Sequence, residues 1–431
     1  MEITLKMAPP PSQPAPLQFC KYSVCGNHFV LVDETQGSRL SEADKSAFAR
    51  LAGDEHFGIG CDSILYLQKY SEDLLRTISE PQQVHQWRLP HLPRDIDFIF
   101  RVFEPNGRES MCCGNGLLSV AHLLERVHGL KTAKILTEVP SSMPRVREVK
   151  TLQANGTCCV NMGPPQNFPE AFIQKHVIQC VKGALSVIDN LHVAFQVKAM
   201  DGSLQNFQLP LQGFLTYTGE PHLIILDNHQ HLLNRVDDLG LYVKDRRSRV
   251  EVGSQRQSAG GDSQTNKQLE MGAVVKAILD DHKECARESP SSIYSIRLLR
   301  QIGLCLNADD SPLFPQGINI NFVRILDARQ GIIEYRCFER GNRKETLACG
   351  TGAIAIAAAA SQFKLVQTDA LRLWPKSSRH RDPQAEQRTT RDADGNWWLE
   401  GDPRLLFTGS TDFFFAQQQK PLGARTSGYS S

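Results

Sequence analysis

The chain has 431 residues, of which 41% are hydrophobic and 22% are charged, as in an ordinary folded globular protein. Its formal net charge of +1 provides no overall field to attract nucleic acid or anionic lipid, so we expect neither as a partner. No run approaches the ~18 apolar residues that a membrane span requires. The start of the chain lacks the apolar core of an export signal, so we expect a cytoplasmic protein whose 12 cysteines are free thiols.

The elements expected along the chain begin with a proline-rich lead-in at residues 1–17, which we predict to be disordered. Short runs of β-branched and aliphatic residues predict strands, for example at 29–32 (FVLV) and 223–226 (LIIL). Three polar stretches have few residues that could join a core, and they predict surface insertions at 70–94, 244–268 and 376–396. Residues 416–431 are expected to form a tail.

An internal repeat is the most informative feature of the sequence. Residues 100–116 read FRVFEPNGRESMCCGNG, and residues 335–352 read YRCFERGNRKETLACGTG. Each copy predicts a strand, a polar turn and a Cys-Gly-x-Gly motif, followed by an apolar helix. Upstream, GNHFVLVD at 26–33 is echoed by GEPHLIILD at 219–227. Two copies in the same order predict two similar lobes, with a ligand bound in the cleft between them.

Both Cys-Gly-x-Gly motifs place a thiol at the expected start of a helix. The unpaired N–H groups and the partial positive charge of a helix start suit a carboxylate, and they lower the pKa of a neighbouring cysteine. A carboxylate held between two such starts would have a thiol on each side. Cys113 and Cys349 are therefore candidates for exchanging an α-proton, one as base and the other as acid, with the roles reversed in the opposite direction.

Other functions explain less of the sequence. A dinucleotide-binding loop requires a third glycine, and Ser119 and Ala355 occupy those positions. A cysteine protease uses one nucleophile with a histidine, which leaves the duplicated motif unexplained. A single Cys-Gly-x-Gly motif is ordinarily a packing feature, so it is the duplication that favours a pair of thiols.

The ordered motifs resemble the diaminopimelate epimerase family, and the resemblance spans most of the chain outside the three polar stretches. The matching segments lie at 24–33 (VCGNHFVLVD), 56–67 (HFGIGCDSILYL), 102–116, 161–164 (NMGP), 219–227, 314–322 (FPQGININF) and 337–352. Residues 400–409 (EGDPRLLFTG) resemble the closing strand of the family. Proline racemases belong to the same wider fold group and also use two cysteines, but these motifs favour the epimerase branch.

The resemblance implies an α+β fold with two pseudo-symmetric lobes, each a mixed β-sheet or barrel wrapped around a central helix. We place the first lobe at 18–162 with a closing strand at 400–415, and the second lobe at 163–399. The resemblance also implies an isomerase that acts on a small amino acid without pyridoxal phosphate, any other cofactor or a metal. Members of the family are often dimers, which leaves a homodimer open.

Residue roles follow from the resemblance position by position. Cys113, which directly precedes Gly-Asn-Gly, and Cys349 match the two catalytic cysteines, whereas the neighbouring Cys112 does not. Four residues would hold the reacting carboxylate by backbone N–H: Gly114, Asn115, Gly350 and Thr351. Further substrate ligands would be Asn27, Asn319, Glu339 and Arg340, of which the last two would bind the far amino and carboxylate groups.

Four further residues are candidates for setting substrate specificity: Ser63, Glu104, Glu220 and His222. A structural role for His222 is equally compatible with the sequence. The family usually has asparagine where Glu104 and Glu220 stand. A substrate carboxylate facing two glutamates is repelled unless one is protonated or bridged by Arg340. Either the distal end of the substrate is not anionic, or these glutamates turn away from it.

Three functions therefore remain open. The first choice is interconversion of LL- and meso-diaminopimelate, a step in the biosynthesis of lysine and of peptidoglycan precursors. The second is racemisation of another amino acid with a neutral or cationic side chain, such as lysine, ornithine or histidine. The third, from a different class, is an inactive amino-acid-binding relative, against which the retention of both cysteines argues.

Overall fold

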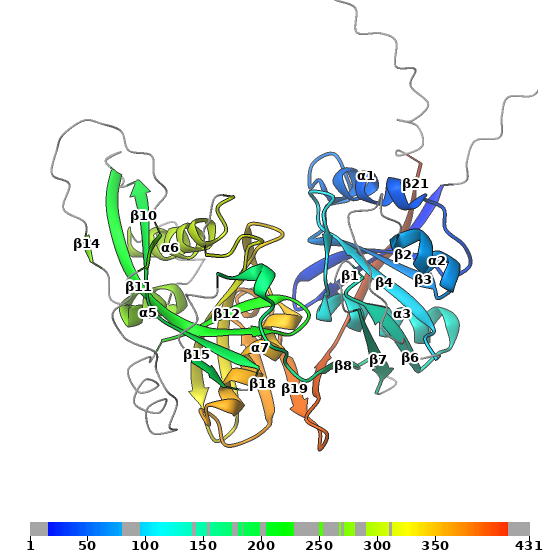
Figure 1. Cartoon of the computed structure of the whole chain (residues 1–431). Helices are drawn as coiled ribbons and strands as arrows, with labels where there is room; N and C mark the ends of the chain where they lie inside the picture. The colour runs from blue at the N-terminus through cyan, green and yellow to red at the C-terminus, as the bar shows by residue number, and fades with distance from the viewer. Residues whose placement is uncertain are drawn as a thin grey trace, which may run out of the picture.

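The computed structural model describes residues 16–79, 95–139, 144–152, 156–174, 180–182, 184–198, 204–227, 250–252, 267–268, 271–280, 290–309 and 313–412. Nearly all of the predicted lead-in at 1–17, the whole tail at 416–431 and most of the stretch at 244–268 lie outside the described residues. The described chain is a mixed β-sheet with helices packed on it, which confirms the prediction of an α+β fold (Figure 1).

The first set of elements runs from β1 to β8, on the right in Figure 1. Their bounds are β1 Leu17–Val24, β2 Asn27–Glu34, α1 Glu42–Gly53, β3 Ser63–Lys69, α2 Glu72–Ser79, β4 Phe98–Phe103, β5 Glu109–Ser110, α3 Gly114–His128, β6 Thr132–Thr137, β7 Arg145–Thr151 and β8 Cys158–Gly163.

The second set runs from η1 to β20 and is followed by β21. The bounds are η1 Glu170–Phe172, β9 Cys180–Lys182, β10 Leu185–Lys198, β11 Leu204–Tyr217, β12 Pro221–Leu226, β13 Val250–Val252, β14 Lys267–Gln268, α5 Met271–Asp280, α6 Pro290–Leu306, β15 Asn319–Asp327, β16 Ile332–Glu339, β17 Lys344–Thr346, α7 Gly350–Gln362, β18 Ala370–Pro375, α8 Lys376–Arg379, β19 Gln387–Arg391, β20 Trp397–Gly401 and β21 Arg404–Thr411.

The two sets of strands are paired in the same way. In the first set β1, β2, β3, β4, β6, β7 and β8 lie side by side, antiparallel except for the parallel pairs β2–β3 and β4–β6. In the second set β11, β12, β15, β16, β18, β19 and β20 repeat this order, with β12–β15 and β16–β18 parallel. The sets join where β8 pairs with β20, and β21 returns to pair with β1.

Helices α3 and α7 follow equivalent short strands, β5 and β17, and lie against the sheet in each set. α3 packs against β1, β6, β7 and β8, and α7 packs against β11, β12, β15 and β19. α7 is apolar on all sides and is buried from Gly350 to Ala360, as expected of a helix enclosed by other elements. Leu117 and Leu124 of α3 share one hydrophobic core with Ile354 and Ala358 of α7, so both helices are packed into the same core.

The prediction that residues 376–396 form a surface insertion is wrong. Residues 376–396 contain α8 and β19, and β19 is an interior strand between β18 and β20. Its polar residues Gln387 and Thr389 are buried, and the Gln387 amide bonds to Asn115 and Tyr335 inside the protein. Polar composition predicted solvent exposure, but buried polar side chains are tolerated where they find hydrogen-bond partners.

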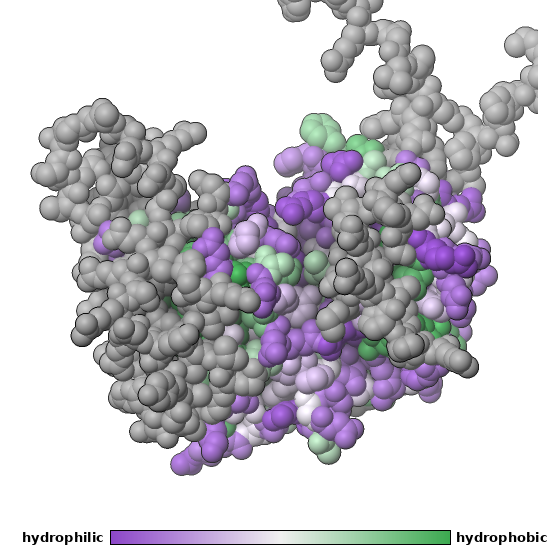
Figure 2. Space-filling model, viewed as in Figure 1, coloured by the Kyte–Doolittle hydropathy of each residue, from purple (hydrophilic) through white to green (hydrophobic). Residues whose placement is uncertain are grey.

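The stretch at 70–94 is only partly described. Its first residues form α2, which buries Leu75 and Ile78 against Ile99 and Leu136. On the face shown in Figure 2 the described surface is mostly hydrophilic, with small scattered hydrophobic patches. Of the helices in the described ranges, none combines the length and the apolar character needed to cross a membrane.

Candidate active site

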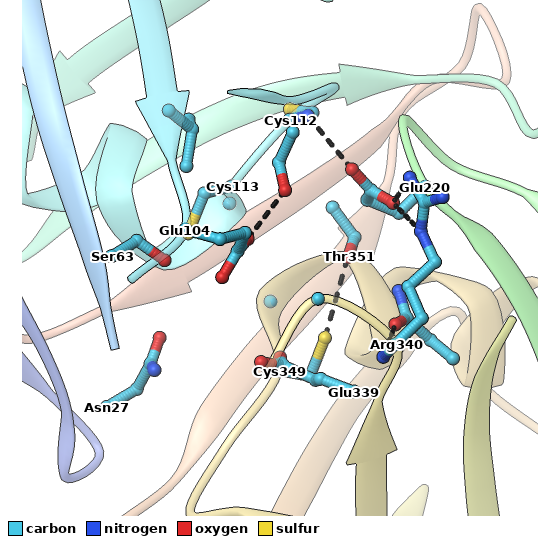
Figure 3. A pocket seen from close by; sticks show the side chains of 16 residues that line it. Asn27, Ser63, Glu104, Cys112, Cys113, Glu220, Glu339, Arg340, Cys349 and Thr351 are labelled. Carbon is cyan, nitrogen blue, oxygen red and sulfur yellow. Dashed lines mark hydrogen bonds and ion pairs between the residues drawn. The ribbon is translucent and has the colours of Figure 1, made fainter. Parts of the chain in front are cut away.

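A pocket with an empty volume of about 480 Å³ lies at the starts of α3 and α7 and is lined from both sets of strands (Figure 3). It brings together twelve of the fourteen predicted site residues: Asn27, Ser63, Glu104, Cys113, Gly114, Glu220, Asn319, Glu339, Arg340, Cys349, Gly350 and Thr351. Asn115 and His222 are the two that do not line it, and both are fully buried behind it.

The two helix starts have nearly the same backbone geometry. Cys113 precedes α3 with φ −138° and ψ 104°, and Cys349 precedes α7 with φ −135° and ψ 115°. The starts also touch, because a Cβ atom added to Gly350 would lie 2.7 Å from the Asn115 backbone nitrogen. Glycine at this position is therefore needed for the close approach of the two backbones.

The two thiols differ in protonation. Hydrogen bonds from Cys337 and Thr351 outweigh burial and lower the pKa of Cys349 to about 7. Burial raises the pKa of Cys113 well above its usual value, although its sulfur accepts a hydrogen bond from the Gly116 N–H at 3.3 Å. The pKa of Cys349 is lowered as expected, but side-chain hydrogen bonds rather than the helix start are the main cause. The expected lowering is wrong for Cys113, where burial dominates. Near neutral pH a thiolate is therefore available at Cys349, while Cys113 stays protonated.

A chain of hydrogen bonds connects Asn321, His222 and Thr351 to the Cys349 sulfur. The Asn321 amide nitrogen lies 3.1 Å from His222 Nδ1, and His222 Nε2 lies 3.0 Å from the Thr351 hydroxyl. That hydroxyl lies 3.5 Å from the Cys349 sulfur. Because Asn321 donates to Nδ1, the Nε2 nitrogen carries the proton and donates to Thr351, which leaves the threonine proton for the sulfur. Burial lowers the pKa of His222 to about 3, so this histidine is neutral and positions Thr351.

Asn27 and Asn115 belong to a second buried network. The two-residue turn Cys25–Gly26, with φ of 49° and 79°, joins β1 to β2 and sets Asn27 at the first position of β2. The Asn27 amide donates to Asp62 at 2.8 Å, and its oxygen accepts from the Asn115 amide at 3.4 Å. The Asn115 side chain thus links the start of α3 to β2, and its backbone nitrogen and side-chain oxygen both lie close to Gly350 at the other helix start.

Glu220 and Arg340 form a closed pair on one wall of the pocket (Figure 3). Glu220 Oε2 accepts from Arg340 Nε at 2.9 Å and Nη2 at 2.7 Å, and Glu220 Oε1 accepts from the Met111 backbone N–H at 2.8 Å. Arg340 Nη1 donates to the Gln316 carbonyl at 2.9 Å, and its guanidinium lies 5.1 Å from the ring centre of Phe172. Arg340 lines the pocket as predicted, but its charge is already neutralised by Glu220.

Glu104 is held differently. Its Oε1 accepts from the Ser110 hydroxyl at 2.5 Å, while its Oε2 is buried and has no hydrogen-bond partner among the described residues. Burial raises the pKa of Glu104 to about 7. Gly341 packs against the carboxyl group so closely that an added Cβ atom would lie 2.7 Å from Glu104 Cδ.

Several contributing residues escaped the sequence analysis. Cys337 occupies the position in the second repeat where the first has Val102. This difference between the two copies could have indicated that Cys337 has a special role. Asp62 lies within a matched motif, whereas nothing local marks Ser110 or Gln387. Among the described residues, Cys337, Glu339 and Cys349 are a group that could hold a metal ion, with ligand atoms within 4.8 Å of one another. The same proximity accounts for the hydrogen bond that lowers the pKa of Cys349.

The comparisons with known proteins agree with the motifs. A diaminopimelate epimerase from Methanothrix thermoacetophila is 25% identical over 354 residues, which cover 81% of this chain and 83% of that protein. The diaminopimelate epimerase from Burkholderia thailandensis is 25% identical over 348 residues, 80% of this chain and 81% of that protein. The predicted resemblance to diaminopimelate epimerases is confirmed. These relatives are isomerases, which bears out the expected enzyme class.

Among solved structures, a predicted epimerase from Pseudomonas aeruginosa matches 92% of this chain and 99% of its own, with a TM-score of 0.45 and 14% identity. A hydroxyproline epimerase from Agrobacterium vitis matches 92% of each chain, with a TM-score of 0.44 and 12% identity. No family model matches the chain.

Proposed function

We propose that this chain inverts the α-carbon of a free amino acid by proton exchange between Cys349 and Cys113. The observation that carries the proposal is that these two thiols line one pocket at equivalent helix starts, and their pKa values are shifted in opposite directions. Inversion by two bases requires one thiolate to remove the α-proton and one thiol to supply a proton to the opposite face. The reverse reaction starts from the other protonation state of the pair.

The helix starts would hold the substrate. The first N–H groups of α3 and α7 lack partners within their own helices, so Gly114, Asn115, Gly350 and Thr351 can offer backbone N–H groups to the substrate carboxylate. Neutralising this carboxylate acidifies the α-proton, which the Cys349 thiolate removes. Glu339 lines the same pocket beside Cys349 and would bind an amino group of the substrate.

The names of the relatives suggest diaminopimelate as the first candidate substrate. The reaction would then be the interconversion of its LL and meso forms, a step in the biosynthesis of lysine and of peptidoglycan precursors. A second candidate is an amino acid with a neutral or cationic side chain. The specific observation in its favour is that Glu220 already neutralises Arg340, the residue expected to bind a distal carboxylate.

The shared pairing order supports a further proposal, that the chain forms two pseudo-symmetric lobes around α3 and α7, with the boundaries expected from the sequence. Catalysis without cofactor or metal, a cytoplasmic location and a homodimer also remain predictions.

The test is incorporation of deuterium from heavy water into a panel of amino acids, followed by mass spectrometry and chiral separation. We expect deuterium at the α-carbon of at least one amino acid, together with its other stereoisomer. Binding of an amino acid without any exchange would instead identify an inactive relative, and would contradict the proposal.

A further inference from the structure

The end of the pocket away from the thiols is defined by a second cavity. Glu104, Ser110, Arg340 and Gly341 line both the active-site pocket and a neighbouring cavity of about 780 Å³ empty volume. The thiols and the glycines at the helix starts line only the first. A substrate whose carboxylate lies at the helix starts therefore extends its side chain toward Glu104 and Arg340, which form the distal end of the pocket.

Within the active-site pocket, the distal end has no unpaired cation among the described residues. Of the described residues that line this pocket, Arg340 is the only lysine or arginine, and two of its three guanidinium nitrogens donate to Glu220. Arg108 and Arg343 line the neighbouring cavity only, and Arg343 is paired there with Asp309. The side chains of Arg340 and Glu220 are 16% and 7% exposed. A distal carboxylate would have to break the pair and leave Glu220 buried without its counter-charge, which is costly in such a setting.

The distal end does offer an acceptor. Glu104 is 8% exposed, and its Oε2 is buried at the pocket without a hydrogen-bond partner among the described residues. A buried polar atom of this kind is stabilised when a ligand brings a donor to it. An approaching ammonium or imidazolium group also favours the ionised carboxylate, which opposes the effect of burial on this group.

We propose that the substrate is an amino acid whose side chain ends in a positively charged donor group, and that Glu104 binds this group. The inference rests on the proposed function, because it assumes that the α-carboxylate lies at the helix starts. Glu220 then serves to keep Arg340 neutralised. With Arg340 neutralised by Glu220 and Glu104 Oε2 without a partner among the described residues, the distal end favours a cation over an anion.

Three compounds isolate the distal groups. L-Lysine is LL-diaminopimelate without the distal carboxylate, and L-2-aminopimelate is the same molecule without the distal amino group. From the rate of deuterium incorporation in heavy water we expect a kcat/KM at least about tenfold higher for lysine than for diaminopimelate, with aminopimelate lowest, because a charge contact of this kind shifts equilibria by about tenfold or more.

Two variants test the residues. Glu104→Gln keeps the shape but removes the charge, and we expect it to lower kcat/KM for lysine at least about tenfold while leaving aminopimelate unchanged or improved. Glu220→Gln keeps an acceptor for the Met111 N–H and releases Arg340, so we expect it to raise kcat/KM for both compounds that carry a distal carboxylate. The control is Asp394→Asn, which removes an exposed carboxylate that lines neither cavity and should change none of the three.

The outcomes separate the two proposals. A native preference for diaminopimelate that survives Glu104→Gln would overturn this inference and leave the proposed function standing. Exchange confined to amino acids with uncharged side chains would do the same. If the native chain exchanges deuterium into no amino acid at all, the proposed function fails and the inference fails with it.

Discussion

The starts of α3 and α7 have the same motif and nearly the same backbone angles, yet their cysteines have opposite pKa shifts. At α7 the Cys349 sulfur has Cys337 and Thr351 as hydrogen-bond partners. At α3 the Cys113 sulfur accepts from the Gly116 N–H, and burial prevails. The repeat therefore builds two equivalent positions, and the residues around each position decide in which direction the pKa of its thiol is shifted.

The largest effect is expected from removing either thiol. Cys113→Ala or Cys349→Ala should reduce inversion by about 10²–10⁴-fold or more, because each takes away one general acid–base group. Cys112→Ala is the matched control, since it removes the neighbouring thiol, and it should retain most activity. Measured racemisation that survives Cys113→Ala but is lost in Cys112→Ala would show that the catalytic register is shifted by one residue.

The contact between the two helix starts can be tested by stability. Gly350→Ala should destabilise the fold by about 1–3 kcal/mol, because the added methyl group would lie 2.7 Å from the Asn115 nitrogen. Gly272→Ala in α5 is the control, with its nearest neighbour, the Asp227 carbonyl, at 3.4 Å, and should be neutral or stabilising. Urea unfolding measures both, and equal stability of the two variants would contradict the close approach.

The difference in protonation predicts a difference in reactivity with pH. Cys349 should be alkylated by iodoacetamide with half its maximal rate near pH 7, because the thiolate is the nucleophile and its pKa is lowered to about 7. Cys113 should stay unreactive until well above pH 9, since burial raises its pKa. Peptide mapping after timed alkylation separates the two sites.

Cys337→Ala sharpens this test, because it removes the largest cause of the lowered Cys349 pKa and should move the alkylation midpoint upward. Cys305→Ala on α6, outside the pocket, should leave the midpoint unchanged. Coincident titration of Cys113 and Cys349 in the native chain would remove the proposed asymmetry.

A smaller effect is expected at Thr351, which connects His222 to Cys349. Thr351→Val keeps the shape but removes the hydroxyl, so the Cys349 pKa should rise and the acid limb of kcat/KM should shift to higher pH. Thr351→Ser restores a hydroxyl and should restore the native pH profile. Identical profiles for Val and Ser at this position would show that the chain of hydrogen bonds does not reach the sulfur.

The sequence predicted the parts of the molecule that rest on local pattern. The two copies of strand, turn and Cys-Gly-x-Gly gave both thiols and the two helices behind them. The ion pair between Glu220 and Arg340 was predicted only as one of several alternatives. The two residues are 120 positions apart in the sequence, so only tertiary packing decides whether their side chains come into contact. Strand β19 was missed because Gln387 is polar yet buried, and Cys337 was missed because a cysteine without a motif usually behaves as a small hydrophobic residue.

The central claim, two thiols acting on opposite faces of one carbon, is tested most directly by isotope distribution early in the reaction. The native chain is incubated in heavy water with a single stereoisomer of an amino acid that it exchanges, and substrate and product are separated at low conversion. The account predicts deuterium at the α-carbon of the product and none in the recovered substrate, because the donated proton comes from the second, solvent-equilibrated sulfur. Product that retains the original α-hydrogen, or substrate labelled as fast as product, would show that a single base serves both faces and would contradict the account.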